Sequence, residues 1–276
     1  MYSFSGLGFD FPLGKQTYIM GILNITADSF FDGGRYTDVN SQLKRASEMC
    51  LEGAHIIDIG AQSTRPGHTI KSAEEEIELL SPILSLLTES VEIPVSVDTY
   101  YPSVAEFALK NGAKIINDVS GVFNPDMAQI VKDYNAGWII THTGESDSST
   151  EVEYKNGVVN EVNSFFDKVI ENCLSVGISI NQIMLDMGIG FGKSHEDNLE
   201  LIRSVSSLKR ENVALMTALS CKRVIKNTSG AGGEDLLFGT ISANTAAIKG
   251  GTDFIRVHHV KENAIAAKTA DALFRR

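Results

Sequence analysis

The chain has 276 residues and a formal net charge of −11 at neutral pH. The acidic balance argues against non-specific nucleic-acid binding, because a polyphosphate would be repelled. No apolar run approaches the length of a membrane span and the N-terminus lacks a signal-peptide pattern, so we expect no membrane association. Cys50, Cys173 and Cys221 are odd in number and far apart. This spacing predicts neither a disulfide framework nor a zinc cluster, and it favours a cytoplasmic location.

Residues 2–17 mix aromatic residues with turn formers and predict a hairpin that closes the bottom of a barrel. Continuous apolar runs follow, which are typical of parallel strands buried on both faces. The runs are Tyr18–Leu23, His55–Ile59, Pro94–Val97, Lys114–Ile116, Trp138–Ile140, Ile183–Leu185, Val213–Leu219 and Asp253–Val257. Amphipathic stretches predict helices between them: Ser41–Glu52, Ala73–Leu87, Ser103–Lys110, Met127–Tyr134, Glu161–Leu174, Asp197–Lys209, Ile241–Ile248 and Lys261–Phe274.

Strand–helix units repeated with right-handed crossovers predict an α/β fold that closes into a (β/α)8 barrel. Neither a linker nor a break in composition divides the chain. Residues 1–276 are therefore predicted to form a single TIM-barrel domain with an N-terminal β-hairpin. A doubly wound open sheet is the alternative.

Polar residues lie at nearly every predicted strand tip, and on a barrel these tips converge on one mouth. One such residue alone most often stabilises a turn. So many partly buried polar groups would be costly in a purely structural protein, so we interpret the set as a binding site. Its members are Asn24, Asp58, Asp98, Asn117, Asp118, His142, Asp186, Lys222, Arg256 and His258.

The chemistry of this set divides in two. Carboxylates and an amide suit a flat heterocycle rich in N–H donors, and they come from Asp58, Asp98, Asn117 and Asp186. Cationic donors suit a phosphate or pyrophosphate, and they come from Arg65, Lys222, Arg256 and His258. Asn24 is predicted to share a magnesium ion with that pyrophosphate, because magnesium takes few protein ligands.

The glycine-rich stretch Gly188–Lys193 (GIGFGK) lacks the spacing of a Walker phosphate loop. We interpret its glycines as a tight turn beside Asp186 that leaves Phe191 free to cover an aromatic ligand.

The chain resembles the dihydropteroate synthase family of pterin-binding TIM barrels from about Met20 to Val260. The segments that carry the resemblance are GILNITADSFFDGG (Gly21–Gly34), DIGAQSTRPG (Asp58–Gly67), VSVDT (Val95–Thr99), INDVSG (Ile116–Gly121), LDMGIGFGK (Leu185–Lys193), LSCKRVI (Leu219–Ile225) and RVHHV (Arg256–Val260). The family joins dihydropterin-methyl pyrophosphate to para-aminobenzoate, its members are commonly homodimers, and sulfonamides imitate the second substrate.

The resemblance also implies roles for individual residues. The pterin-pocket positions are matched by Asp98, Asn117, Asp186, Phe191 and Lys222. The pyrophosphate and magnesium positions are matched by Asn24, Arg256 and His258. The para-aminobenzoate loop is matched by Thr64, Arg65 and Pro66, which act with the loop Thr26–Gly34.

Several residues depart from the family pattern. Cys221 replaces an arginine before Lys222, although the neighbouring Arg223 offers a guanidinium. Met187 and Ala27 each replace a proline of the family pattern. Thr141 and Thr143 flank His142, where methionine is usual. These departures keep two alternatives open: a non-catalytic or altered-acceptor pterin-binding paralogue, and a corrinoid-linked methyl-folate methyltransferase.

Overall fold

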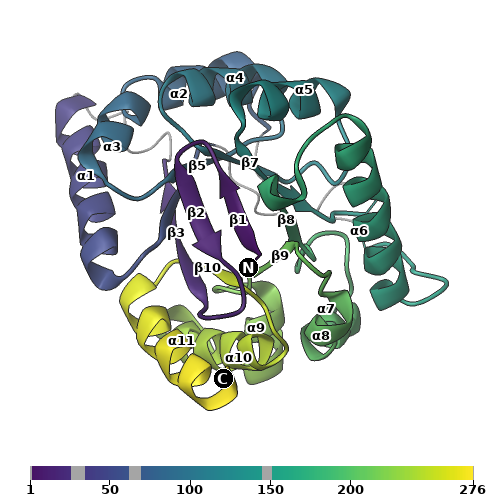
Figure 1. Cartoon of the computed structure of the whole chain (residues 1–276). Helices are drawn as coiled ribbons and strands as arrows, with labels where there is room; N and C mark the ends of the chain where they lie inside the picture. Colours follow the sequence, from purple (N-terminus) through teal and green to yellow (C-terminus); the bar gives the residue numbers. More distant parts are fainter. Residues whose placement is uncertain (1, 26–34, 62–69, 145–150, 276) are drawn as a thin grey trace.

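The structure is a computed structural model, and it describes residues 2–25, 35–61, 70–144 and 151–275. Eight parallel strands close into a barrel in the order β10-β3-β4-β5-β6-β7-β8-β9, with helices around it (Figure 1). The strands are β3 (Tyr18–Asn24), β4 (Ile56–Gly60), β5 (Val95–Asp98), β6 (Ile115–Asp118), β7 (Gly137–Thr141), β8 (Ile183–Asp186), β9 (Ala214–Thr217) and β10 (Phe254–Val257). The predicted barrel is confirmed, and an open sheet is excluded because β10 pairs with β3.

The predicted N-terminal hairpin is also confirmed. Strands β1 (Ser3–Gly6) and β2 (Phe9–Pro12) pair antiparallel and cover one end of the barrel (Figure 1). The hairpin rings of Phe4 and Phe11 lie 5.7 and 5.6 Å from the ring of Phe254. They form one apolar cluster with interior residues of the barrel, such as Met20 and Ile56. This end of the barrel is therefore filled with apolar side chains.

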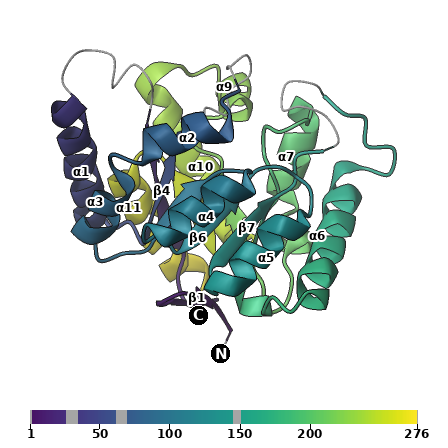
Figure 2. The same cartoon turned by 90° about the horizontal axis from the view of Figure 1, so that it is seen from above.

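The surrounding helices are α1 (Arg35–Glu52), α2 (Ala73–Leu80), α3 (Leu84–Ser90), α4 (Pro102–Lys110), α5 (Pro125–Tyr134), α6 (Val158–Ser175), α7 (His195–Arg203), α8 (Val205–Leu208), α9 (Arg223–Ser229), α10 (Leu236–Lys249) and α11 (Val260–Phe274), with short 3-10 turns η2 (Ile180–Gln182) and η3 (Gly233–Asp235). No described helix is long and apolar enough to cross a bilayer. Figure 2 shows both chain ends on the side of the hairpin.

Two helix predictions need correction, and a further helix was not predicted. The stretch Ala73–Leu87 was predicted as one helix, but α2 ends before Pro82, whose ring cannot continue a regular helix. The stretch Asp197–Lys209 is likewise divided, because α7 ends at its C-cap Ser204. Helix α9 was not predicted: its seven residues begin inside the segment LSCKRVI, where no long apolar period precedes them.

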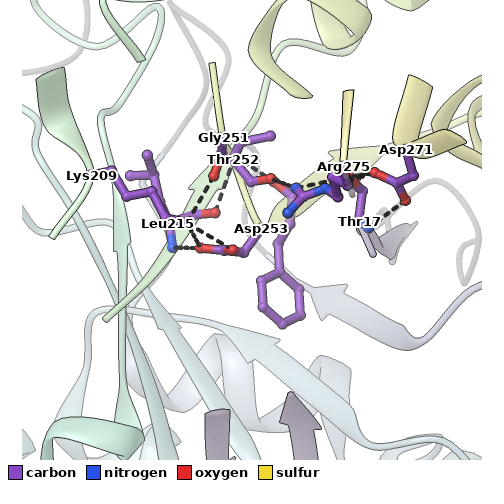
Figure 3. A network of polar contacts seen from close by, with 9 residues as sticks. Thr17, Lys209, Leu215, Gly251, Thr252, Asp253, Asp271 and Arg275 are labelled. Atoms are coloured by element: carbon purple, nitrogen blue, oxygen red, sulfur yellow. Dashed lines mark hydrogen bonds and ion pairs between the residues drawn. The ribbon is translucent and has the colours of Figure 1, made fainter. Parts of the chain in front are cut away.

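A network of polar contacts ties the hairpin end of the barrel together (Figure 3), and we call it the base network. It consists of Thr17, Lys209, Thr252, Asp253, Asp271 and Arg275. The two oxygens of Asp253 accept from Lys209 Nζ at 2.9 and 2.8 Å, and one also accepts from the Leu215 amide. Asp271 accepts from both the amide and the hydroxyl of Thr17 at 2.7 Å and from Arg275 Nε at 2.8 Å. These contacts fasten α11 and the loop before β9 to the barrel.

Candidate active site

A cluster of charged and amide side chains fills the opposite end of the barrel. We call it the mouth cluster, and it consists of Asp58, Asp98, Asn117, Asp186, Lys222 and Arg256. Arg256 on β10 donates from Nε to Asp58 Oδ2 at 2.6 Å and from a terminal nitrogen to Asp98 Oδ2 at 2.8 Å. Asn117 on β6 donates to the same Asp58 oxygen at 3.1 Å. Three strands thus meet at Asp58, and Arg256 adds a fourth through Asp98 on β5. Asp58 is fully buried and lies two residues before the end of β4.

Asp186 and Lys222 form the other half of the mouth cluster. Asp186 ends β8, and its Oδ1 accepts from the Gly188 amide at 2.9 Å. Lys222, the N-cap residue of α9, donates from Nζ to the carbonyl of Ile189 and lies 5.0 Å above the ring of Phe191. The turn that follows β8 therefore carries both the aromatic ring and the present acceptor of Lys222.

Burial shifts the ionisation of these groups. It raises the pKa of Asp98 to about 7, although the Arg256 charge opposes the rise. It also raises the pKa of Asp186, against Lys222, and lowers the pKa of Lys222 to about 8, against Asp186. For Arg256, burial acts against the charge but Asp58 and Asp98 outweigh it, so its pKa is raised. Two groups at one mouth with pKa values near neutrality, here Asp98 and Lys222, are typical of a functional site.

Several buried polar atoms near the mouth cluster have no hydrogen-bond partner in the described part of the chain: Asp58 Oδ1, Asn117 Oδ1, Ser96 Oγ and Thr141 Oγ1. Ser96 pairs in register with Asp58, and Thr141 with Asp186. A buried acceptor without a partner costs about 1–3 kcal/mol, so such atoms need an explanation. A ligand with several N–H donors supplies one.

The rim holds the residues that were assigned to pyrophosphate and magnesium. Asn24 ends β3 and is exposed, between the strands that carry Arg256 and Asp58. His258 Nδ1 lies 3.0 Å from Ser220 Oγ, and the His258 amide donates to the same oxygen at 3.2 Å.

Cys221 next to this pair has the left-handed backbone angle φ 57°, and its amide donates to Thr240 Oγ1 at 3.1 Å. Arg223 begins α9 and is exposed, so it lies at the rim and outside the mouth cluster. Thr64, Arg65 and Pro66, with the loop 26–34, lie outside the described residues.

A magnesium ion held by protein ligands alone does not fit this site. The described residues contain no group of three or more His, Cys, Asp or Glu side chains that could hold a metal. The exposed amide of Asn24 fits an ion that is completed by phosphate oxygens and water.

Two residues of the predicted tip set face away from the mouth. Asp118 accepts from Trp138 Nε1 at 3.3 Å and from the Ser120 amide at 2.9 Å. Its neighbour Asn117 points into the barrel, because successive strand residues face opposite sides. The ring of His142 packs against that of Phe165, with 5.1 Å between the ring centroids, and burial lowers the pKa of His142 to about 3.

Two buried charged residues near the site were missed. Glu76 accepts from the Thr99 hydroxyl at 2.8 Å, directly after Asp98, and burial raises its pKa to about 7. Its position three residues after Ala73 and four before Leu80 is the spacing of a buried helix face, which could have revealed it. Lys193 is also buried, inside the glycine-rich stretch.

Comparisons with known proteins agree with this geometry. A family model described as pterin binding enzyme matches residues 20–258. A dihydropteroate synthase of Clostridium beijerinckii is 39% identical over 269 residues, covering 97% of this chain and 98% of the relative. A dihydropteroate synthase of Clostridium difficile, solved in the presence of pteroic acid, has a TM-score of 0.90 and 38% identity, and the match covers 96% of this chain and 100% of that one. A Xanthomonas albilineans dihydropteroate synthase with 4-aminobenzoic acid has a TM-score of 0.85 and 33% identity, and covers 94% and 93%.

The chain belongs to the family of pterin-binding enzymes, whose model spans most of its length. Within that family its relatives assign it to the dihydropteroate synthases, which are transferases of folate biosynthesis. The comparisons favour neither the methyltransferase nor the non-catalytic alternative.

Proposed function

We propose that the chain joins dihydropterin-methyl pyrophosphate to para-aminobenzoate and releases pyrophosphate. The observation that carries this proposal is the mouth cluster, in which buried carboxyl acceptors stand beside a partly buried guanidinium and an ammonium. The acceptors suit the N–H groups of a pterin, and the cations suit a pyrophosphate.

The pterin ring is bound by Asp98, Asn117 and Asp186. Asp186 uses Oδ1 for the Gly188 amide, which leaves Oδ2 for a ligand donor. Asn117 and Asp58 each have a buried oxygen without a partner in the described residues. Phe191 covers one face of the ring, and Lys222 moves from its carbonyl acceptor to an acceptor atom of the pterin.

The reaction is dissociative. The bond between the pterin methylene carbon and the pyrophosphate oxygen breaks, and the electron pair leaves with the pyrophosphate. The amine nitrogen of para-aminobenzoate then bonds to the methylene carbon and gives up a proton. Asp98 stabilises the cationic pterin-methyl fragment, while Arg256 and His258 stabilise the departing charge.

Arg256 is well prepared for this role, because Asp58 and Asp98 fix its guanidinium through two hydrogen bonds and leave other donors for a ligand. Asn24 would hold a magnesium ion, which would supply positive charge for the leaving group.

We assign the arylamine site to Thr64, Arg65 and Pro66 and to residues 26–34, all of which lie outside the described residues, and to the rim residues Ser220 and Cys221. Sulfonamides, which imitate para-aminobenzoate, compete there. The change to cysteine at position 221 removes a guanidinium from this rim, and Arg223 lies nearby at the start of α9.

The protein acts as a homodimer in the cytoplasm. Large apolar side chains are exposed on α10 and α11, among them Phe238, Ile265 and Leu273, and a second copy would cover them. All three cysteines are free thiols, which suits a reducing compartment. Sedimentation velocity tests the dimer, and a purely monomeric species at micromolar concentration would contradict it.

A pyrophosphate-release assay with both substrates tests the reaction. The wild type is expected to release pyrophosphate only when the pterin substrate and para-aminobenzoate are both present. Lys222→Ala and Arg256→Ala are expected to lower the rate about a hundredfold or more, whereas Lys110→Ala, on the exposed surface of α4, serves as the control and keeps it. Equal rates in all four proteins would contradict the proposal.

A further inference from the structure

The turn Gly188–Gly192, between β8 and α7, is held by a buried lysine that the proposed reaction does not use. Lys193 is only 5% exposed. Its Nζ donates to the carbonyl oxygens of His142, Gly188 and Phe191, each at 3.0 Å. An ammonium has three N–H donors, and here all three go to main-chain carbonyls. Lys193 therefore joins the end of β7 to both sides of the turn.

The turn lies very close to the end of β7, so its shape depends on the contacts that Lys193 makes with both segments. Gly188 has φ +66°, and a Cβ at this position would lie 1.8 Å from the carbonyl oxygen of His142. Two carbonyls that approach the same point repel each other unless a donor lies between them, and Lys193 supplies that donor. On the far side of the turn, Asn198 accepts from the Gly190 amide at 2.7 Å, and Tyr154 donates to the Gly192 carbonyl at 3.2 Å.

The two lysines of this region contact different carbonyls of the same turn. Lys222 donates to Ile189, between the two turn carbonyls that Lys193 holds. When Lys222 moves to a pterin, Ile189 loses its donor, whereas the carbonyls of Gly188 and Phe191 keep theirs. The turn can then keep its shape although one of its two cations has left.

We propose that Lys193 is a positioning residue that fixes the turn Gly188–Gly192, so that Asp186 and Phe191 stay in place while Lys222 turns to the substrate. The identity of the ligand rests on the proposed function, but the clamping of the turn does not. Lys193 touches no reacting atom, and its effect passes through the backbone of the turn.

Two matched variants test this inference. Lys193→Met keeps the length of the side chain and removes all three donors. Tyr154→Phe keeps the ring and removes one donor from the edge of the same turn. Hydrogen exchange, measured without ligand on folded protein, is expected to be at least tenfold faster across residues 187–193 in Lys193→Met and nearly unchanged in Tyr154→Phe. Exchange in Lys193→Met that equals that of the wild type would overturn the inference, whatever the protein binds.

Substrate measurements then separate positioning from general stability. In Lys193→Met we expect KM for the pterin substrate to rise about tenfold or more, because a displaced turn misplaces its ring and carboxylate. We expect KM for para-aminobenzoate to stay within threefold. A fall in kcat alone, with both KM values unchanged, would contradict a positioning role. An inactive wild type would refute the proposed function and leave the exchange result to decide the clamp.

If Lys193→Met does not fold, a crystal structure of the wild type with a non-reactive pterin decides the same question. Lys193 Nζ is expected to keep its three carbonyl contacts while Lys222 Nζ leaves Ile189. Movement of Lys193 toward the pterin, or crystals in which the turn changes shape, would overturn the inference.

Discussion

The two ends of the barrel both carry networks of paired charges, but they differ in what they leave unpaired. In the base network, both oxygens of Asp253 and both oxygens of Asp271 accept hydrogen bonds from described residues. In the mouth cluster, Asp58 and Asn117 each keep a buried oxygen without a described partner.

The base network thus satisfies itself, as a structural network must, whereas the mouth cluster keeps acceptors for something else. The polarity of a site is therefore less informative about its role than its unmet hydrogen-bonding capacity. Burial shifts the pKa values of the mouth residues Asp98, Asp186 and Lys222, which means that their charged forms cost folding free energy at that end. Stability and function should therefore respond oppositely to substitutions at the two ends.

The largest effect is expected for Asp98→Asn. The amide keeps the shape of the side chain but cannot stabilise a cation, so kcat should fall about 10²- to 10³-fold. Stability at pH 8 should rise, because burial disfavours the ionised carboxylate that the amide replaces. Steady-state kinetics and urea unfolding on one preparation measure both. A less stable variant with normal kcat would reverse the assignment of the two ends.

Lys209→Met tests the base network. Asp253 is fully buried and would lose its cation, so the free energy of unfolding should fall by about 3 kcal/mol while kcat per folded molecule stays the same. Asp253→Asn should lower the free energy of unfolding by less than Lys209→Met does, because Lys209 is 37% exposed and water can solvate its charge. A loss below about 0.5 kcal/mol for Lys209→Met would mean that the base network does not stabilise the fold.

Glu76→Gln tests the mouth end of the barrel through the pH dependence of stability. The folded-state pKa of Glu76 is about 7 because of burial, above its ordinary value, so the folded protein binds more protons than the unfolded chain between about pH 4 and 7. This group therefore makes stability fall as the pH rises through that window. Glu76→Gln should remove the fall and be more stable than the wild type by roughly 2–3 kcal/mol at pH 8, with little difference at pH 4. Parallel unfolding curves across that range would rule this out.

The smallest effects come from one substitution made at both ends. Thr17→Val removes a hydroxyl that donates to Asp271 at 2.7 Å and should cost about 1 kcal/mol. Thr141→Val removes a buried hydroxyl without a described partner, so it should be neutral or slightly stabilising. The two thermal unfolding midpoints should therefore move apart. If both variants lose the same stability, unmet capacity does not distinguish the ends.

The sequence predicted the barrel and the strand tips well, because both follow from local pattern. Each apolar run overlaps a strand, and Asp98, Asn117 and Asp186 lie in the last two residues of theirs. The sequence could not predict how deep below the mouth each strand-tip side chain lies. Asp58 lies two residues before the end of β4 and accepts a hydrogen bond from Arg256. This contact joins residues that are 198 positions apart in the chain.

Residues were missed where tertiary contacts override local appearance. Glu76 follows two other glutamates and resembles a solvated helix start, yet it is buried against Thr99. Lys193 resembled the end of a glycine-rich loop, but its ammonium group donates to main-chain carbonyls of two segments, the end of β7 and the turn after β8. Pro82 did carry a local signal, and the single helix predicted there ignored it.

The central claim is that free acceptors of the mouth cluster, including Asp186 Oδ2, bind a pterin. Calorimetric titration of a non-reactive pterin into the wild type, Asp186→Asn and Thr17→Val tests it most directly. We predict one binding site in the wild type, the same affinity in Thr17→Val, and an affinity at least about tenfold lower in Asp186→Asn, where a charged acceptor is lost. Equal affinity in all three proteins, or no binding to the wild type, would contradict the claim.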